Sequence, residues 1–325
     1  MRIFITGAAG FIGHNVVRFF EQQGIECFGI DNRTTYGFVQ QAELDYLLKE
    51  RFKRIRSVPL VADIRNTDDI KSRIGIFNCD TIVHLASFPR QKVVSQSPVI
   101  ASEVMTTGLI NLLEAARLHK IRRFVYISSS MVYGDFETDV TEDAVCNPIG
   151  QYGIMKYMGE KLVEDYARQY GFEYVIIRPS AVYGELDVED RVVSKFMLGA
   201  MRGDTLKVKG ANEVLDFTYV QDAAKGIAQA TVSKNSANKI YNITRSSEKQ
   251  YTLKDAAELA ISIAGKGAIQ VEDRDLAFPK RGRLNIDRAV KDFGYSPTVN
   301  VEEGFLKYYN WFQSSYFWQN KLGEV

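Results

Sequence analysis

The chain has 325 residues, of which 46% are hydrophobic and 25% are charged. This length allows about two domains of roughly 150 residues, each with its own core, and the composition is that of a globular protein. The formal net charge is +1. No overall basic field therefore marks a binder of nucleic acid or of an anionic membrane, and we expect a small-molecule partner.

Cysteine usage and the start of the chain bear on the compartment. Cys27, Cys79 and Cys146 are odd in number and widely spaced, which predicts neither a disulfide framework nor a metal site. Apolar residues follow Met1 almost at once, which leaves no room for a secretory signal. We also find no apolar run that approaches the ~20 residues needed to span a bilayer. We therefore expect a soluble, cytoplasmic protein that binds no metal and contacts no membrane.

Short apolar runs alternate with helical periodicity from Arg2 to about Tyr183. This alternation predicts an α/β protein with a Rossmann-type, doubly wound parallel sheet that is covered by helices on both faces. The predicted strands are Ile3–Thr6, Glu26–Ile30, Val58–Val61, Thr81–Leu85, Arg123–Ser128 and Tyr174–Arg178. The predicted helices are Ile12–Gln23, Glu43–Arg51, Thr67–Ile74, Ser102–His119 and Ile149–Tyr170.

After Tyr183 the alternation becomes irregular and predicts a smaller, mixed α/β lobe at the C-terminal end. Its predicted helices are Val192–Arg202, Thr252–Ala264 and Val301–Trp311. Within it, Phe217–Val220, Asp222–Ala230 and Lys239–Ile243 again predict strand, helix and strand, so we expect the chain to return to the first domain. We therefore assign residues 1–180 and 214–244 to the first domain and residues 181–213 and 245–325 to the lobe, with a substrate cleft between them.

A glycine-rich turn follows the first predicted strand. Gly7, Gly10 and Gly13 lie between this strand and the first helix, where glycines let the strand turn sharply and let backbone amides approach a pyrophosphate. Asp31 ends the second strand about 20 residues further on, where a carboxylate can bind the adenosine ribose and repel a 2′-phosphate. These positions predict NAD rather than NADP, and the nearby Arg33 is the one residue that complicates this choice.

Three polar side chains are expected to meet at the carboxyl edge of the same sheet. Ser129 follows the fifth predicted strand, and Tyr152 and Lys156 lie four apart at the start of a helix. A phenol with a pKa near ~10 is a poor base at neutral pH, but an ammonium one helical turn away lowers that pKa. We expect Tyr152 to remove a hydroxyl proton while hydride leaves the same carbon for NAD. Ser129 would hydrogen-bond the reacting oxygen, and Lys156 can also reach ribose hydroxyls.

Eight segments of the chain form a characteristic set. They are Thr6–Gly13, Asp31–Asn32, Asp63–Arg65, His84–Ala86, Ser128–Gly134, Tyr152–Lys156, Arg178–Gly184 and Asp216–Val220. This set resembles the extended short-chain dehydrogenase/reductase family, in particular its nucleotide-sugar epimerase and dehydratase branch, and it covers nearly the whole chain. The resemblance implies that the first domain binds NAD and that the lobe binds a nucleotide sugar. It also implies a homodimer that forms through the helices around residues 102–119 and 149–170.

The resemblance implies two sets of contact residues. Those for the cofactor are Gly7, Gly10, Phe11, Ile12, Gly13, Asp31, Asn32, Asp63, Ile64, Leu85, Ala86, Tyr152, Lys156 and Pro179. Those for the substrate are Ser87, Lys92, Ser129, Ser130, Met131, Tyr152, Ala181, Arg191, Arg281 and Arg283. A guanidinium suits phosphate oxygens, so either Arg281 or Arg283 is expected to hold the diphosphate, with a solvated basic turn as the alternative.

Met131 reduces the number of candidate reactions. In the related 4,6-dehydratases and UDP-glucuronate decarboxylases, an acidic residue follows the catalytic serine or threonine by two positions, whereas the thioether of Met131 has no proton to exchange. The resemblance therefore favours a 4-epimerase of a UDP-hexose or UDP-uronate, which oxidises C4, rotates the keto sugar and returns the hydride from NAD that stays bound. The alternatives are a decarboxylase, a 4,6-dehydratase or a keto-sugar reductase of the same fold, and a non-catalytic NAD-binding sensor or interaction protein.

Several positions depart from the family pattern. Leu215 stands where many members carry a diphosphate-binding arginine, and Ala181 stands where many epimerases carry asparagine or threonine. The segment Arg191–Phe196 resembles the decarboxylase branch instead. The loop Pro89–Lys92 follows the fourth strand, and its two cations could meet a uronate carboxylate, although surface charge is the simpler explanation.

Overall fold

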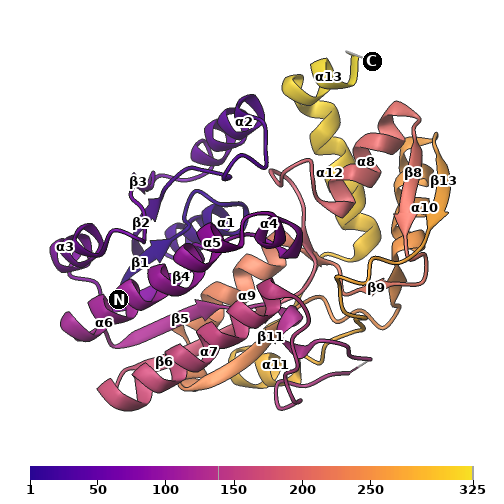
Figure 1. The fold of residues 1–325 in the computed structure, drawn as a ribbon. Helices are drawn as coiled ribbons and strands as arrows, with labels where there is room; N and C mark the ends of the chain where they lie inside the picture. Colours follow the sequence, from indigo (N-terminus) through magenta and orange to yellow (C-terminus); the bar gives the residue numbers. More distant parts are fainter. Residues whose placement is uncertain (138, 324–325) are drawn as a thin grey trace.

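The computed structural model describes residues 1–137 and 139–323. At its centre is a seven-stranded sheet whose neighbouring strands all pair in parallel (Figure 1). In spatial order the strands are β11 (Lys239–Ile243), β6 (Glu173–Pro179), β5 (Arg123–Ile127), β4 (Thr81–His84), β1 (Arg2–Thr6), β2 (Glu26–Asp31) and β3 (Leu60–Val61). The order reverses between β1 and β4, and ligands of open α/β sheets bind at the carboxyl ends of the strands beside such a reversal.

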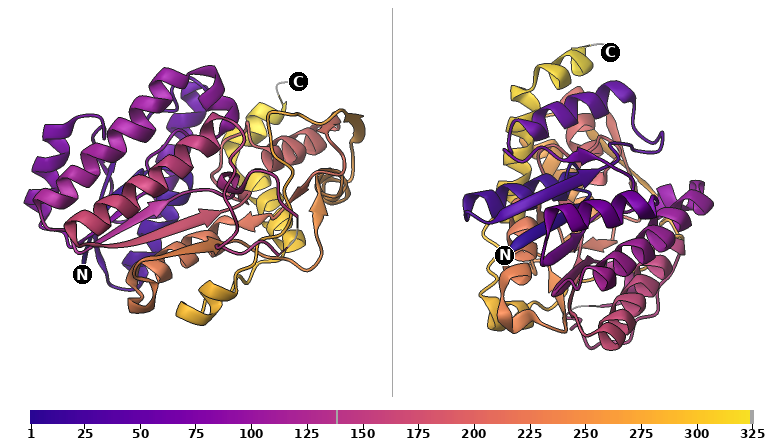
Figure 2. Two further views of the ribbon diagram at one scale, coloured as in Figure 1. Left: turned by 60° about the horizontal axis from the view of Figure 1, so that its bottom comes forward. Right: turned by 90° about the vertical axis from the view of Figure 1, so that its left-hand side faces the viewer.

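Helices cover both faces of this sheet (Figures 1 and 2). On one face lie α1 (Phe11–Gln22) and α9 (Val220–Val232); on the other lie α3 (Thr67–Phe77), α5 (Pro98–Ser102), α6 (Gly108–Leu118) and α7 (Gln151–Tyr170). Successive residues of a strand point to opposite faces, and both sets are apolar here because both faces are covered. In β1, Phe4 contributes to the core beneath α3, α6 and α7, whereas Ile3 and Ile5 contribute to the core beneath α1 and α9.

The C-terminal lobe lies beside the carboxyl ends of the strands (Figure 2). Its helices are α8 (Val192–Arg202), α10 (Leu253–Ala264), α12 (Val301–Ser314) and α13 (Tyr316–Gly323). Outside the central sheet, six strands form three pairs: β7 (Val182–Tyr183) with β10 (Thr218–Tyr219), β9 (Val214–Leu215) with β12 (Tyr251–Thr252), and β8 (Thr205–Lys209) with β13 (Ala268–Glu272). A separate hydrophobic core joins these elements and includes Leu47 of α2 (Gln41–Phe52). The lobe is therefore tied to the first part of the chain by packing as well as by its connections.

The structure confirms the predicted α/β class and doubly wound sheet, with shifts at the ends of several elements. The strand predicted at Val58–Val61 begins only at Leu60, because Pro59 has no N–H for a sheet hydrogen bond. The helix predicted at Ser102–His119 begins at Pro98 and contains a π-helical turn at Glu103–Thr107. The helices and strands that were not predicted include α4 (Gln91–Gln96), α11 (Asp287–Phe293), α13 and the short strands β7, β8, β9, β12 and β13.

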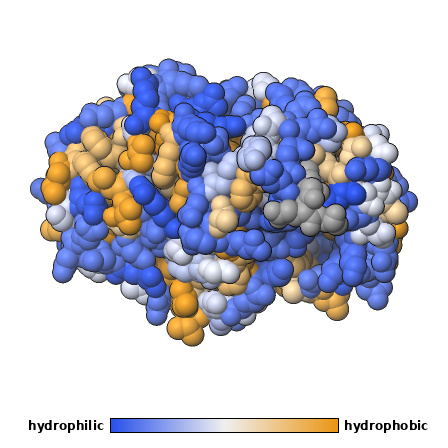
Figure 3. All heavy atoms as spheres, turned by 90° about the horizontal axis from the view of Figure 1, so that it is seen from above, coloured by the Kyte–Doolittle hydropathy of each residue, from blue (hydrophilic) through white to orange (hydrophobic). Residues whose placement is uncertain are grey.

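One helical stretch corrects the expectation that no apolar segment is long enough to span a bilayer. The 21 residues Pro98–Leu118 are long and apolar enough to cross a bilayer by length and composition alone. Of the most apolar part of this stretch, 56% is buried inside the protein, because one side packs against α3 and α7 as a core helix does. Its other side leaves Val99, Ile100 and Leu118 exposed. Elsewhere, Figure 3 shows apolar side chains distributed on a mainly hydrophilic face.

Candidate active site

The turn between β1 and α1 is built for close approach of backbone. Gly7 has a φ of +71°, and a Cβ at this position would lie 2.6 Å from the amide nitrogen of Ala86. A Cβ at Gly13 would lie 2.0 Å from the carbonyl oxygen of Gly7, so α1 passes directly beneath the turn. Gly10 is the N-cap of α1 and provides no side-chain cap. The first-turn amides of α1, which include those of Phe11 and Ile12, are therefore available to an anion such as a pyrophosphate.

Asp31 lies at the end of β2 and faces this turn. Its Oδ2 accepts a hydrogen bond from the Ala9 amide at 3.1 Å, and its Oδ1 accepts one from the Arg33 amide at 2.7 Å. Burial raises the pKa of Asp31, and these two hydrogen bonds oppose that change. The Arg33 guanidinium is engaged elsewhere, because Nη2 donates to the Pro59 carbonyl at 2.7 Å and Cζ lies 5.0 Å from the centre of the Phe52 ring.

Two further residues predicted for the cofactor are brought together after β2 and β3. Asn32 Nδ2 lies 3.3 Å from Asp63 Oδ2 and donates to it. Arg65 pairs with the same carboxylate at 2.8 Å, and its hydrogen bonds lower the pKa of Asp63. Asn111 Nδ2 donates to the carbonyl of the buried Ile64 at 3.0 Å. This part of the site is thus held in place by polar contacts within the protein.

The loop after β4 is fixed by Thr6. Its Oγ1 accepts a hydrogen bond from the Ala86 amide at 3.2 Å and lies 2.8 Å from His84 Nδ1. Burial lowers the pKa of His84 to about 3, so this imidazole is neutral at physiological pH. Leu85 and Ala86 therefore lie beside Gly7. Ser87, the first residue predicted for the substrate, donates from Oγ to the Phe88 carbonyl at 3.1 Å.

Ser129, Tyr152 and Lys156 converge beyond the carboxyl end of β5. Ser129 Oγ accepts a hydrogen bond from the Met131 amide at 3.2 Å and caps a 3-10 turn, Ser130–Tyr133. The Ser129 side chain lies close enough to the Tyr152 phenol to lower the pKa of Tyr152. Lys156 Nζ lies 5.9 Å from the centre of the Tyr152 ring and donates to the Ile127 carbonyl at 2.7 Å.

The protonation of this group differs from the prediction made from the sequence. Burial raises the pKa of Tyr152, while the charge of Arg191 and the nearby Ser129 side chain act to lower it. Burial lowers the pKa of Lys156 to about 7, with the charge of Glu160 opposing that change. The expectation that Lys156 lowers the tyrosine pKa is therefore wrong for the protein alone. Burial outweighs the effects of Arg191 and Ser129, Lys156 is not among the groups that lower the pKa of Tyr152, and with a pKa of about 7 its amine is only partly charged at neutral pH.

A buried ion pair behind these residues was not predicted. Glu160 lies one helical turn beyond Lys156 and accepts from Arg178 Nε at 2.9 Å and Nη2 at 2.7 Å. Ser128 Oγ donates to the same carboxylate at 2.5 Å. Both charged side chains are almost fully buried, which requires such pairing. The only sequence signal was a glutamate on the buried face of α7.

The residues predicted for the substrate lie on several segments. Ser130 Oγ donates to Ser180 Oγ at 3.2 Å, next to Pro179 at the end of β6, and Met131 is buried. Ala181 follows with a φ of +38°, a left-handed conformation that an alanine rarely adopts. Leu215 is also buried, and it packs in the lobe core.

The cations around this region are mostly paired. Lys92 Nζ lies 3.6 Å from Asp190 Oδ1, and Arg90 Nη2 lies 2.6 Å from the Oδ2 of the same carboxylate. Arg191 Nε lies 3.6 Å from the buried Asp187. The basic loop Pro89–Lys92 therefore already faces an anionic residue of the protein.

The two candidate diphosphate ligands differ in their surroundings. Arg283 Nη2 pairs with Asp139. Nε is buried without a hydrogen-bond partner in both arginines, among residues 1–137 and 139–323, and no ion pair within the same residues involves Arg281. Burial lowers the pKa of Arg281 to about 10, which leaves it charged at neutral pH. Asp216 fixes the segment that carries both arginines, since its Oδ2 accepts from the Leu284 amide at 3.2 Å.

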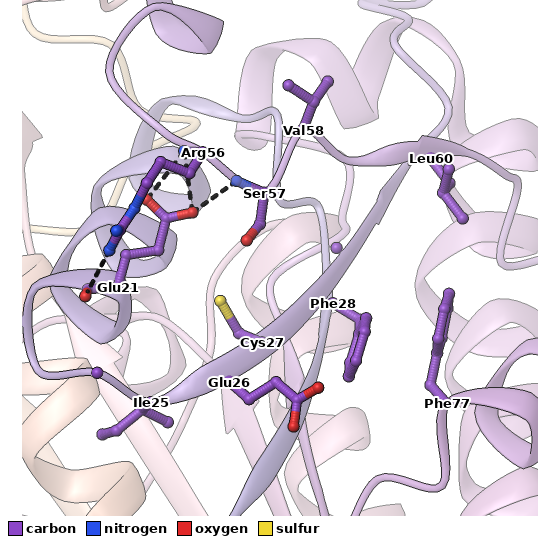
Figure 4. A pocket seen from close by; sticks show the side chains of 12 residues that line it. Glu21, Ile25, Glu26, Cys27, Phe28, Arg56, Ser57, Val58, Leu60 and Phe77 are labelled. Carbon is purple, nitrogen blue, oxygen red and sulfur yellow. Dashed lines mark hydrogen bonds between the residues drawn. The ribbon is translucent and has the colours of Figure 1, made fainter.

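Two hollows lie away from the predicted site residues. One, of about 620 Å³, lies beside the first residues of β2 and is lined by the side chains shown in Figure 4, including Phe28 and Phe77, whose rings are stacked. The other, of about 800 Å³, lies between α2 and the C-terminal helices α12 and α13. The first is at the amino end of a strand, whereas Asp31 and Ser129 follow carboxyl ends. Neither hollow is lined by Ser129, Tyr152 or Lys156.

Comparisons with known proteins agree with this arrangement. Residues 3–244 match the family described as "NAD dependent epimerase/dehydratase family". A putative UDP-glucose 4-epimerase of Methanocaldococcus jannaschii is 30% identical over 324 residues, which cover 96% of this chain and 99% of that protein. The structure of UDP-glucuronic acid 4-epimerase from Bacillus cereus, in complex with UDP-glucuronic acid and NAD, is similar with a TM-score of 0.86 at 26% identity and covers 96% of this chain and 98% of that one.

The similarity extends to dehydratases. The structure of dTDP-glucose 4,6-dehydratase from Streptomyces venezuelae has a TM-score of 0.86 at 23% identity and covers 99% of this chain and all of that one. At this identity the likeness shows the fold alone. The family match spans most of the sequence and agrees with the predicted family, fold class and cofactor. The chain belongs to the NAD-dependent epimerase/dehydratase family.

Proposed function

We propose that this protein is a nucleotide-sugar 4-epimerase that acts on a UDP-hexose or a UDP-uronate with tightly bound NAD. The observation that carries this proposal is the convergence of Ser129, Tyr152 and Lys156 beside a buried Met131. The first three can exchange a proton with a sugar hydroxyl and orient it. Met131 offers no acid for a following elimination.

The glycine turn fits a dinucleotide because it leaves the first-turn amides of α1 uncapped and has no room for side chains at Gly7 and Gly13. Asp31 would bind the adenosine ribose, and Lys156 would reach the other ribose. Arg33 is held by Pro59 and Phe52, which supports NAD over NADP because its guanidinium is already engaged and is not free to bind a 2′-phosphate. When bound, oxidised NAD supplies the hydride acceptor and a positive charge.

In the proposed mechanism, Tyr152 takes the proton of the C4 hydroxyl and Ser129 donates a hydrogen bond to the oxygen that becomes the ketone. Burial raises the pKa of Tyr152 in the protein alone. The phenolate therefore depends on positive charge, for which Arg191 and a protonated Lys156 are the protein's own sources. On the return step Tyr152 gives the proton back after the keto sugar has turned its other face.

The diphosphate would bind to Arg281. Both arginines have a buried Nε without a partner among the described residues, but Arg283 already pairs with Asp139 through Nη2, and Arg281 has no such ion pair among those residues. A buried guanidinium without an anion is stabilised when a phosphate enters. Arg281 therefore takes over the role that Leu215 cannot fill.

A decarboxylase or dehydratase is the second candidate. Arg191 acts electrostatically on Tyr152, and the segment Arg191–Phe196 resembles the decarboxylase branch. A non-catalytic NAD-binding protein is disfavoured because Ser129, Tyr152 and Lys156 are all present and lie together.

The deciding experiment is a panel of UDP-, GDP-, CDP- and dTDP-sugars incubated without added cofactor, with products identified by NMR. Inversion at C4 of one sugar supports the epimerase. A dehydrated, decarboxylated or reduced product without C4 inversion rejects it.

We also propose a homodimer that forms through α7 and the helix Pro98–Leu118. Both helices carry exposed apolar side chains, namely Ile154 and Met158 on α7 and Val99, Ile100 and Leu118 on the other. Burial of these side chains against a second copy explains why Pro98–Leu118 is so apolar. Sedimentation of the wild type and of Ile154→Glu tests this, since the variant should be monomeric.

We further propose that the enzyme is cytoplasmic. Cys27, Cys79 and Cys146 are all free, which is in keeping with that compartment.

A further inference from the structure

The helix that carries Tyr152 begins without a cap of its own. The N-cap of α7 is Gly150, which has a φ of +81° and no side chain to accept a hydrogen bond from the first-turn amides. Such amides need an acceptor from elsewhere. The amide of Tyr152 donates to Oε1 of Gln91 at 2.9 Å. The acceptor therefore comes from a residue 61 positions earlier in the chain.

Gln91 is fixed in the orientation that this contact requires. It is buried and is the first residue of α4. Its Nε2 donates to Ser95 Oγ at 3.1 Å, so the amide oxygen is the atom directed at α7. A Cβ on Gly150 would lie 2.5 Å from Gln91 Cδ. The absence of a side chain at Gly150 is thus what lets the glutamine amide reach the helix.

The neighbours of Gln91 anchor it to the other side of the site. Arg90 Nη2 pairs with Asp190 at 2.6 Å, and Lys92 Nζ lies 3.6 Å from the same residue. Asp190 directly precedes Arg191, whose charge acts on Tyr152. The segment of residues 90–92 is therefore held between the start of the catalytic helix and the start of α8.

We propose that Gln91 is a positioning residue that caps α7 from α4 and holds Tyr152 in place against Ser129 and the reacting carbon. This rests on the proposed role of Tyr152 as the base. Gln91 does not contact the reacting atoms. It acts by fixing the first turn of α7, where a small displacement of the phenol would spoil proton transfer.

The test compares Gln91→Met with Gln96→Met. Both residues are glutamines of α4, but Gln96 is exposed. UDP-glucose and UDP-glucuronate are the probes, and the one that the wild type turns over is used for all variants. Gln91→Met should lower kcat by about ten- to a hundredfold, with KM and NAD content within about twofold of the wild type. Gln96→Met should leave kcat unchanged. Gln91→Glu keeps an acceptor at the helix N-terminus and should restore most of the lost kcat.

Equal kcat values for Gln91→Met, Gln96→Met and the wild type would overturn the proposal, as would a Gln91→Glu variant no better than Gln91→Met. Hydrogen exchange of the wild-type Tyr152 amide keeps the proposal testable if the variants do not fold. This amide should be protected although it lies in the first turn of a helix, and unprotected exchange would also overturn the proposal. Tyr152→Phe distinguishes a failure of the proposed base from a failure of the proposed role of Gln91. If this variant retains full turnover, Tyr152 is not the base, whatever the Gln91 variants show.

Discussion

The cofactor side and the sugar side of this site are built in different ways. On the cofactor side, backbone geometry sets the site: Gly7 and Gly13 leave no space for a Cβ, and the first-turn amides of α1 are left uncapped. On the sugar side, side chains from distant segments set it, and most of the charges pair with each other, as Arg90 does with Asp190 and Arg283 does with Asp139. Backbone motifs can be read from consecutive residues, whereas a set of side chains drawn from several loops cannot.

The residues that we propose as catalytic, Ser129, Tyr152 and Lys156, are those for which we expect the largest effect. Tyr152→Phe removes the only hydroxyl proposed to exchange the proton, so kcat should fall by about 10²- to 10⁴-fold. NAD should stay bound because the glycine turn and Asp31 are untouched. Single-turnover kinetics and the absorbance of the bound cofactor measure both quantities. Turnover within tenfold of the wild type would remove Tyr152 from the mechanism.

Breaking the cofactor side should affect every activity at once. In Gly13→Ala the new Cβ would lie 2.0 Å from the Gly7 carbonyl oxygen, so the turn must open and bound NAD should be largely lost. Gly24→Ala is the matched control, because a Cβ there meets nothing within 4 Å. Gly24→Ala should lower the free energy of unfolding by only about 1 kcal/mol, because an alanine there must adopt a left-handed backbone conformation. Cofactor content after gel filtration distinguishes the two, and full NAD occupancy in Gly13→Ala would contradict the assignment of the turn.

The sugar side should respond in binding rather than in chemistry. Arg281→Met should raise KM for the nucleotide sugar by about ten- to a hundredfold, the effect of removing a charge-assisted phosphate contact. Arg283→Met is the matched variant and should have the smaller effect, because the Arg283 guanidinium already pairs with the carboxylate of Asp139. Calorimetric titration with UDP gives the same comparison without turnover. The reverse order of effects would exchange the roles of the two arginines.

The smallest expected effect is on stability and comes from Lys156. Burial lowers its pKa to about 7, so between pH 7 and about 10 the unfolded chain binds a proton that the folded protein does not. The free energy of unfolding should therefore rise with pH across this window. Lys156→Met has no amine that must lose its proton on folding, so it should be more stable than the wild type at pH 7. This difference in the free energy of unfolding should shrink by roughly 2 kcal/mol between pH 7 and pH 9.

Urea unfolding of cofactor-free protein at the two pH values measures this difference. Tyr152 and the buried cysteines titrate in both proteins, so they cancel in the comparison. A gap between the two proteins that is independent of pH would show that Lys156 keeps an ordinary pKa.

The sheet, its order of strands and helices, the family and the cofactor could be predicted because each depends on local patterns such as apolar runs and the spacing of Gly7, Gly10 and Gly13. The shortened β3 depends on one residue, Pro59, which has no N–H for a sheet hydrogen bond. The partners of Glu160 and Gln91 could not be predicted, because Arg178 and Tyr152 reach them only through the fold. The prediction that the pKa of Tyr152 is lowered was wrong for the same reason. The spacing of the two residues places a lysine near a tyrosine but does not reveal how deeply both are buried.

The central claim is that hydride leaves C4 of a nucleotide sugar and returns to the other face on the same NAD. NMR of the purified enzyme with UDP-glucose and UDP-glucuronate in deuterated water, without added cofactor, tests it most directly. The account predicts inversion at C4 with the C4 hydrogen retained, because it travels as hydride and never exchanges with solvent. Loss of that hydrogen to solvent, or a product altered elsewhere while C4 keeps its configuration, would contradict the account.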